Sequence, residues 1–277
     1  MTDPPASPST PSGLAVRVVR ASVIAALVMF VTGPFLILGL WSISKQWFWP
    51  SLLPSRLTLE WFGWALNVPG VLQALQTSLL VAALTTVVCT LIGLPSAIAL
   101  SRWKSPISTV IRTLLALPLM VPYIALGIGI TQLFRQLGLL NSMMGLVLAH
   151  TVGTFPFAIL VLTSACSELS IEISEAAYVC GANRWQTFRR VMLPLLAPAL
   201  VAEAVYVFTL SMDEFTLTLL VSGPDTITLP VRIYTSIGEG FIQLTSALSV
   251  LLLVPSLVLI YVMVKRINVK ALSAGGG

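Results

Sequence analysis

The stretch EAAYVCGANRWQTFRRVMLPLLAP, residues 175–198, is polar and bears three arginines, although most of the chain around it is hydrophobic. Hydrophobic residues make up 57% of the 277 residues and charged residues only 9%, and the mean hydropathy is +0.97. Soluble domains usually carry about 25% charged residues. The composition therefore indicates an all-α, polytopic membrane protein, in which a polar stretch of this length is unusual.

Six stretches are apolar and long enough to span a membrane, because ~30 Å of hydrocarbon takes about 20 helical residues. They cover residues 21–42, 74–100, 113–134, 143–164, 195–221 and 241–264. The first residues of the chain are rich in Pro, Ser and Thr, which is typical of disorder. We therefore expect three segments: a disordered tail over 1–16, a single six-helix membrane domain over 17–270, and a flexible tail over 271–277.

The distribution of basic residues predicts how these spans are oriented. If both termini are cytoplasmic, the cytoplasmic segments hold eleven of the 15 Lys and Arg residues. The outer loops then hold the other four, which are Lys45, Arg56, Arg135 and Arg232. Because Lys and Arg accumulate in short cytoplasmic loops, both termini are expected in the cytoplasm. The same bias explains the net charge of +5, so no nucleic-acid partner is expected.

The cytoplasmic segment 167–197 carries the signals of two short helices. Gly181 can end the first helix, because a glycine readily adopts the left-handed conformation that follows a helix. Asn183, with a glutamine three residues later, resembles a capping box for the second helix. Pro194 is expected to end that helix, since the residue before a proline avoids the α region. The segment is therefore predicted to be a helix–Gly–helix lying parallel to the membrane.

The faces of these two helices suggest a contact surface. Ala176 and Ala177 lack bulk and would let another backbone approach closely. Trp185, Phe188 and Met192 recur at three- and four-residue spacing and form an apolar stripe. The residues alone leave two interpretations open, an amphipathic helix on the bilayer surface or a docking surface for another protein.

The stretch resembles the EAA loop of inner-membrane permease subunits in binding-protein-dependent ABC importers. That pattern reads EAA, three residues, Gly, nine residues, Ile, one residue and Leu-Pro, and Val191 stands here in place of the isoleucine. The resemblance implies that the loop docks into a cleft on a cytoplasmic ATPase and transmits its opening and closing. The residues expected to carry this coupling are Glu175, Ala176, Ala177, Gly181, Trp185, Phe188, Leu193 and Pro194.

The resemblance also implies a set of partners and a location. The expected partners are a cytoplasmic ABC ATPase dimer, a second homologous permease, a periplasmic solute-binding protein and membrane lipid. The chain would cross the bacterial inner membrane several times. It has no GxxxxGK[ST] phosphate-binding loop, so ATP and Mg would be bound by the ATPase. We expect no enzyme activity, no cofactor and no metal in this chain.

Two further stretches resemble one branch of these permeases. Residues 145–162 and 208–234 are similar to permeases for polyamines, opines and aminophosphonates, with ferric-iron permeases nearby. SMDEF followed by TLPVRIY is similar to the second permease of spermidine/putrescine importers. The implied substrate is a polyamine, and the alternatives are 2-aminoethylphosphonate and ferric iron.

The fifth predicted span is unusual because it contains three acids. Intramembrane acids commonly mark a transport path, and we assign Glu203, Tyr206, Asp213 and Glu214 to a substrate path. On one ideal helix, Glu203 and Glu214 would share a face, and Tyr206 and Asp213 would share an adjacent face. The alternatives are helix packing against a basic residue of the partner permease, simple exposure at the outer surface, or a proton-coupled secondary transporter. His150 is interpreted as a histidine whose hydrogen bonds are satisfied within the bundle.

Overall fold

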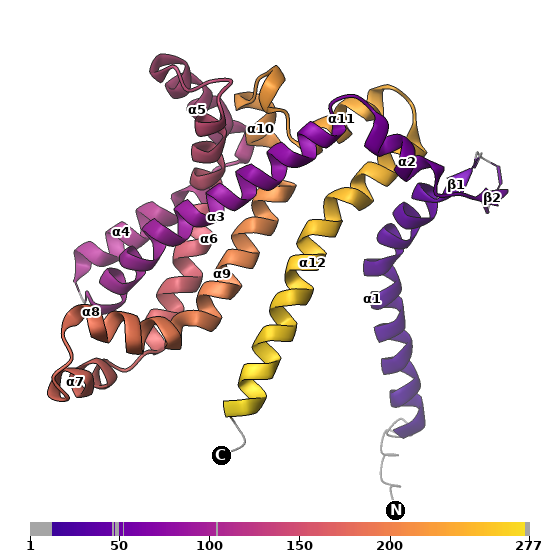
Figure 1. The fold of residues 1–277 in the computed structure, drawn as a ribbon. Helices are drawn as coiled ribbons and strands as arrows, with labels where there is room; N and C mark the ends of the chain where they lie inside the picture. The colour runs from indigo at the N-terminus through magenta and orange to yellow at the C-terminus, as the bar shows by residue number, and fades with distance from the viewer. Residues whose placement is uncertain (1–12, 46, 48–49, 52, 104, 275–277) are drawn as a thin grey trace, which may run out of the picture.

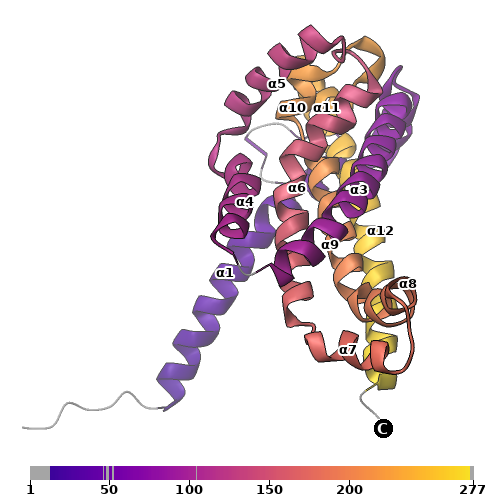
Figure 2. The same ribbon diagram turned by 90° about the vertical axis from the view of Figure 1, so that its left-hand side faces the viewer.

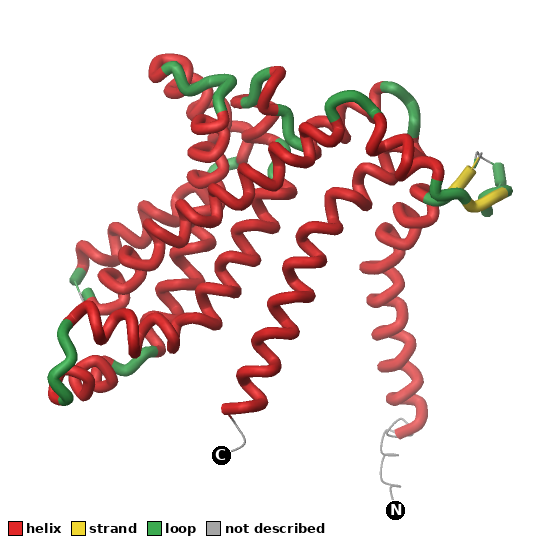
Figure 3. The backbone as a smooth tube through the Cα atoms, viewed as in Figure 1, coloured by secondary structure: helices red, strands yellow, loops and turns green. Residues whose placement is uncertain are grey.

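The computed structural model describes residues 13–45, 47, 50–51, 53–103 and 105–274, and these are almost entirely helical (Figures 1 and 3). The long helices are α1 (Gly13–Ser42), α3 (Val71–Arg102), α6 (Met143–Glu168), α9 (Leu193–Asp213) and α12 (Ile242–Ala274). The shorter helices are α2 (Glu60–Asn67), α4 (Pro106–Ala116), η1 (Leu117–Met120), α5 (Tyr123–Leu137), α7 (Ile171–Val179), α8 (Arg184–Thr187), η2 (Phe188–Met192), α10 (Thr216–Val221), η3 (Pro224–Thr226) and α11 (Leu229–Gly238). A short antiparallel pair, β1 (Ser44–Lys45) and β2 (Arg56–Leu57), lies between α1 and α2.

The centre of the bundle is formed by α3, α6 and α9, which pack against one another (Figure 2). Leu94, Leu162 and Leu196, one from each of these helices, belong to a single buried cluster. Ala97 of α3 and Ala158 of α6 are completely buried. Small side chains of this kind let membrane helices approach closely, which strengthens their van der Waals packing.

Five of the described helices are long and apolar enough to cross a membrane, and a bent pair would bring the number to six. The bent pair joins α4 and η1 to α5 at an angle of 105°. The prediction of a continuous third span over 113–134 was therefore wrong. Val121 is extended, with ψ of 129°, because it precedes Pro122 and a residue before proline avoids the α region.

The predicted fifth span over 195–221 is also interrupted. Helix α9 ends at Asp213, Glu214 is extended with ψ of 116°, and α10 begins at Thr216. Glu203 and Glu214 therefore do not share the face of one continuous helix, as the sequence had predicted. The hydrogen bonds that stabilise this break are described with the candidate site.

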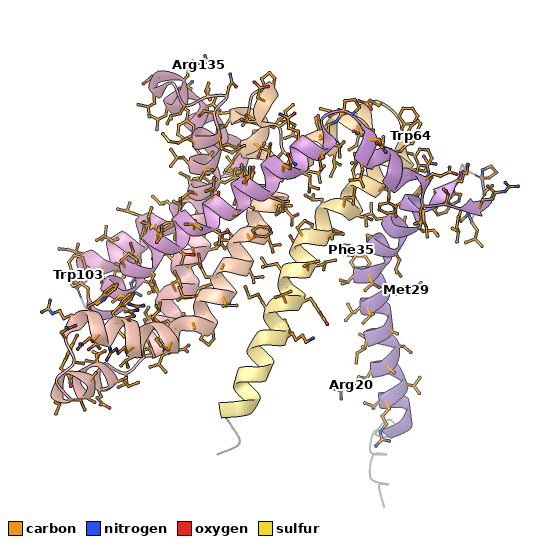
Figure 4. All side chains as sticks on the ribbon, viewed as in Figure 1. Arg20, Met29, Phe35, Trp64, Trp103 and Arg135 are labelled. Atoms are coloured by element: carbon orange, nitrogen blue, oxygen red, sulfur yellow. The ribbon has the colours of Figure 1, made fainter. Side chains whose placement is uncertain are left out.

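Helix α1 stands apart from the central bundle (Figure 1) and makes its principal contacts with α12. Its side chains are exposed over residues 16–32, and Met29 (labelled in Figure 4) is 75% exposed. Residues 1–12 of the predicted N-terminal tail lie outside the described residues, whereas residues 13–16 belong to α1. Likewise, α12 extends to Ala274, and residues 275–277 of the predicted C-terminal tail lie outside the described residues.

The two ends of the bundle differ in what they carry (Figures 1 and 2). The start of α1 and the end of α12 lie at the same end as α7 and α8, whereas α5, α10 and α11 lie at the opposite end. Trp103 and Arg135 mark these two ends in Figure 4. The polar loop around residues 171–192 and the acids at the end of α9 are thus separated by the length of α9.

Candidate functional site

The first part of the polar loop is a short helix that ends at a left-handed glycine. Gly181 has φ of +82°, a conformation that L side chains rarely adopt. Its N–H donates to the carbonyl of Tyr178 at 2.9 Å, and the N–H of Ala182 donates to the carbonyl of Ala177 at 3.0 Å. These bonds satisfy carbonyls that the helix end would otherwise leave free. The backbone here has the geometry that the sequence predicted.

A capping box begins the second helix. Asn183 Oδ1 accepts the N–H of Gln186 at 2.9 Å, and Gln186 Oε1 accepts the N–H of Asn183 at 3.0 Å. This reciprocal pair occupies two backbone donors that have no partner within the helix. Together with Gly181, the box fixes where the chain turns between α7 and α8.

The prediction that Pro194 ends this second helix was wrong, because the helix continues into α9. Proline has no N–H, and in a regular α-helix its ring strikes the carbonyl four residues earlier. Here the preceding turn, η2, is a π-helix in which the N–H of Leu193 donates to Phe188, five residues back. This wider turn gives the proline ring room, so the helix passes through it.

The loop is attached to the bundle by an arginine that the sequence analysis did not single out. Arg102 Nη2 donates to Ser174 Oγ of α7 at 3.0 Å and lies 3.7 Å from Met192 Sδ of η2. Ser174 and Met192 are buried. One side chain at the end of α3 therefore contacts both helices of the loop. The signal in the sequence was a basic residue in the last turn of a helix, which is too common to indicate a particular partner.

The residues predicted to contact an ATPase divide into an exposed group and a partly buried group. Phe188 and Leu193 pack against the cluster at the base of α3, α6 and α9. Trp185 is 65% exposed although its ring lies 5.7 Å from that of Phe188. The exposed members of the set are Glu175, Ala176, Gly181, Trp185 and Pro194, and the half-buried members are Ala177, Phe188 and Leu193.

Two further apolar side chains extend this surface. Val179 is 88% exposed and Tyr178 is 44% exposed, and both lie on the last turn of α7. Tyr178 and Val179 stand within the quoted stretch, so their position next to the EAA residues was available as a signal. Together with Trp185, they make an exposed apolar surface on both sides of the Gly181 turn.

The four residues assigned to a substrate path are not equally accessible. Tyr206 and Asp213 are exposed, whereas Glu203 is fully buried and Glu214 is 8% exposed. Tyr206 and Asp213 are seven residues apart, so they lie on the same face of α9, two turns from each other. The geometry therefore brings Tyr206 and Asp213 to one surface and places the two glutamates inside the subunit.

Glu214 holds the start of α10. Its carboxylate accepts the N–H of Leu217 at 2.9 Å and that of Thr218 at 3.0 Å. A carboxylate in this position satisfies free backbone donors and interacts favourably with the positive end of the helix dipole. The acid therefore stabilises the break that separates α9 from α10.

His150 joins the two sides of this break. Its Nδ1 lies 2.8 Å from Ser211 Oγ on α9, and its Nε2 lies 2.8 Å from Thr218 Oγ1 on α10. The Glu214 carboxylate lies 3.9 Å from Nε2. Because the imidazole is completely buried and both ring nitrogens have partners, the observed contacts are those of a satisfied core histidine.

Aromatic pairs lie before and after Asp213 along the chain. The rings of Phe157 and Tyr206 meet edge to face with centroids 5.4 Å apart. The rings of Phe215 and Tyr234 are 5.0 Å apart, and Tyr234 is 55% exposed.

Within the described residues, no group of three or more His, Cys, Asp or Glu side chains has the arrangement of a metal site.

Five long apolar helices and a bent pair that could form a sixth span are typical of a polytopic membrane protein. Residues 89–271 match the model of the family described as the binding-protein-dependent transport system inner membrane component, and the chain belongs to this family. It is therefore a permease of an ABC importer and a multi-pass protein of the bacterial inner membrane. Family membership favours an ATP-driven importer over a proton-coupled secondary transporter.

Two relatives match nearly the whole chain. PotC of Escherichia coli (strain K12), a spermidine/putrescine transport system permease protein, is 31% identical over 244 residues, which are 88% of this chain and 92% of PotC. PhnV of Salmonella typhi, a proposed 2-aminoethylphosphonate transport system permease protein, is 31% identical over 252 residues, or 90% of this chain and 94% of PhnV. Such relatives are transport permeases rather than enzymes, and permease subunits bind no cofactor themselves.

The fold is also found in a solved structure. A crystal structure of a bacterial ABC transporter that imports the acidic polysaccharide alginate matches with a TM-score of 0.74 and 19% sequence identity. The match covers 94% of this chain and 99% of the other. At this level of identity, the match establishes the ABC permease fold and leaves the substrate to other arguments.

Proposed function

We propose that this permease lines the translocation path of an importer for small organic cations, with spermidine or putrescine as the substrate. The observation that supports this proposal is the exposed carboxylate of Asp213, which lies on the same face of α9 as the exposed ring of Tyr206. Among the described residues, Asp213 forms no ion pair. A carboxylate and an aromatic ring about 10 Å apart on one helix face suit a polyamine, whose ammonium groups are spaced along its chain. One ammonium would pair with Asp213 while another makes a cation–π contact with Tyr206.

The remaining members of the predicted path take a different role in this proposal. Glu203 and Glu214 are buried, where Glu203 contacts Thr90 of α3 and Glu214 caps α10. Tyr206 and Asp213 therefore supply the surface that meets the substrate. The similarity to PotC supports a polyamine. The similarity to PhnV supports 2-aminoethylphosphonate as a second candidate, because that molecule also carries an ammonium group. Ferric iron remains a third candidate on the sequence resemblance.

The proposal includes an orientation and a set of partners. We place α7, α8 and both chain ends in the cytoplasm and the ends of α5, α10 and α11 toward the periplasm. The positive-inside bias supports this orientation. A periplasmic solute-binding protein would deliver the substrate to a cavity between this subunit and a second permease, which is either a different chain or a second copy of this one. An ATPase dimer that binds ATP and Mg would dock on residues 175–194.

An uptake assay with the full importer in proteoliposomes tests the proposed substrate. Labelled spermidine, putrescine, 2-aminoethylphosphonate and ferric iron would be offered separately. We expect uptake of the polyamines, and we expect Asp213→Asn to lower it without loss of assembly or of ATP hydrolysis. Asp225→Asn, which alters an exposed acid on η3, is the matched control. Equal polyamine uptake by wild type and Asp213→Asn, or transport of an anionic solute alone, would contradict the proposal.

A further inference from the structure

Glu203 is an acid placed at the middle of a membrane helix. It lies ten residues from each end of α9 (Leu193–Asp213), which at 1.5 Å per residue is about 15 Å from either end. Its side chain is completely buried within this subunit. Oε2 lies 2.8 Å from Thr90 Oγ1 of α3, and Oε1 has no hydrogen-bond partner among the described residues.

The hydroxyl of Thr90 has two acceptors within reach but only one proton. Besides Glu203 Oε2, it lies 2.9 Å from the carbonyl oxygen of Thr86, one turn earlier on α3. If Glu203 is ionised, both neighbours of the Thr90 oxygen are acceptors, so one of the two short contacts is left without a hydrogen. If Glu203 is protonated, Oε2–H donates to Thr90 Oγ1, and Thr90 donates to the Thr86 carbonyl. Only the protonated form supplies a hydrogen to each contact.

None of the described side chains supplies a positive charge that would favour the ionised form of Glu203. Glu203 forms no ion pair among the described side chains, and a buried, unpaired carboxylate is strongly disfavoured. The helices packed against α9 are α3, α6, α12 and η2. The structure describes the side chains of α12 only as far as Lys265. Among the described side chains of these helices, the charged and titratable ones are Cys89, Arg102, His150, Cys166, Glu168, Arg189, Arg190, Tyr261 and Lys265.

None of these groups serves as a counter-charge for Glu203. His150 is bonded to Ser211 and Thr218, and Arg102 is bonded to Ser174. Cys89 lies 3.5 Å from Thr154 Oγ1 and is a buried thiol. The side chains of Glu168, Arg189, Arg190, Tyr261 and Lys265 are exposed, and Cys166 is buried.

We infer that Glu203 is held as a neutral carboxylic acid whose proton clamps α9 to α3 through Thr90 and the Thr86 carbonyl. Glu203 is then a positioning residue in the interior of the subunit, away from the surface that we propose meets the substrate. It keeps α3 and α9 together while Asp213, at the end of the same helix, remains exposed to the path. The inference concerns helix packing and holds whichever solute the importer carries.

The proton can be observed directly by infrared spectroscopy of the full importer in lipid nanodiscs. A protonated carboxyl group has a carbonyl stretching band that is distinct from the bands of ionised carboxylates and that shifts in D2O, whereas lipid ester bands do not shift. The difference spectrum of wild type minus Glu203→Gln at pH 8 is expected to contain this band. Glu60→Gln, which alters an exposed acid paired with Lys45, is the matched control and is expected to leave the band in place.

Substitutions test the clamp independently of the proton. Gln at 203 is neutral, has nearly the same size and can donate an N–H to Thr90, so Glu203→Gln is expected to assemble and to transport like wild type. Glu203→Ala removes the donor and leaves a cavity, so it is expected to lose thermal stability. Absence of the band in wild type, or loss of assembly or transport in Glu203→Gln, would overturn the inference. Failure of the proposed cation path would instead appear as unchanged uptake in Asp213→Asn.

Discussion

Arg102, the last residue of α3, donates a hydrogen bond of 3.0 Å to Ser174 Oγ, which lies 72 residues later on α7. The bond joins the central bundle to the loop that we propose as the ATPase contact. Replacing Arg102 by Ala is expected to loosen α7 and to reduce the coupling of ATP hydrolysis to uptake. A double-mutant cycle with Ser174→Ala measures the contact, and the two effects on stability should be non-additive by about 1 kcal/mol. Strictly additive effects would show that the bond contributes nothing.

The second prediction concerns Ala177, where we expect the ATPase to approach the loop closely. Ala177 is half-buried on α7 beside the exposed Ala176, so a large side chain at 177 would occupy the surface that we propose docks the ATPase. Ala177→Trp is expected to abolish uptake while the subunit remains inserted and paired with the second permease. Ala177→Ser is the control, because serine adds one atom only. The measurement is uptake together with pull-down of the ATPase, and normal uptake in a well-expressed Ala177→Trp variant would disprove the docking assignment.

The turn at Gly181 gives the third prediction. Its φ of +82° is accessible to glycine, is tolerated by asparagine, and costs other L residues roughly 1–2 kcal/mol. Nothing lies within 4 Å of a Cβ built there, so strain rather than a clash determines the outcome. Gly181→Asn is expected to retain more uptake than Gly181→Val at equal expression. The same uptake in both variants would show that the left-handed turn is not required.

The fourth prediction concerns how exposed the three residues of the apolar stripe are, namely Trp185, Phe188 and Met192. Trp185 is exposed and Met192 is buried, with Phe188 between these limits. In a Cys180→Ser background, which removes an exposed native thiol, a cysteine at 185 should react quickly with a soluble reagent and become protected when the ATPase binds. A cysteine at 188 should react more slowly in both states.

The control for this labelling is a cysteine at Thr235, an exposed position on α11 at the opposite end of the bundle. Its reactivity should not depend on the ATPase. If a cysteine at 185 is labelled equally with and without the ATPase, the stripe rests on the membrane surface instead.

The Glu214 carboxylate gives the fifth prediction. Because it accepts the N–H groups of Leu217 and Thr218, Glu214→Ala is expected to destabilise the start of α10 by about 1 kcal/mol, as for other helix caps. Thermal unfolding of the assembled importer measures the effect. Glu214→Asp shortens the side chain and should recover only part of the loss. A variant without any change in thermal unfolding would show that α10 does not need this cap.

Local features of the sequence predicted local structure well. Hydropathy located the long helices, because crossing or filling the bundle requires many apolar residues in succession. Gly181 and the Asn183–Gln186 pair were predicted correctly because a cap bonds to backbone only a few residues away. The same reasoning failed at Pro194, where one π turn accommodated the proline.

Features that depend on distant residues were missed. The interruption after Asp213 is stabilised by His150, which reaches Ser211 and Thr218 from α6, 61 and 68 residues away. The partner of Arg102 lies on a different helix, and hydropathy does not distinguish one basic residue from another. The acids of α9 were correctly recognised as unusual, but their exposure depends on helices that no pattern in α9 reveals. Sequence reasoning therefore selected these acids as candidates and could not divide them into exposed and buried ones.

The π turn at Phe188–Met192 has a mechanical consequence for any signal passing along α9. A π turn holds one residue more than an α turn, and a single residue of an α-helix corresponds to about 1.5 Å of rise and 100° of rotation. If the turn were to tighten into α geometry, the segment before it would rotate and translate relative to Leu193 while α9 itself stayed in register. The π turn lies near the N-terminal end of the continuous helix Arg184–Asp213, which carries Trp185 before the turn and Asp213 after it. The two parts of this helix can therefore rotate relative to each other. A force on Trp185 can thus rotate the segment before the π turn without rotating Asp213 by the same angle.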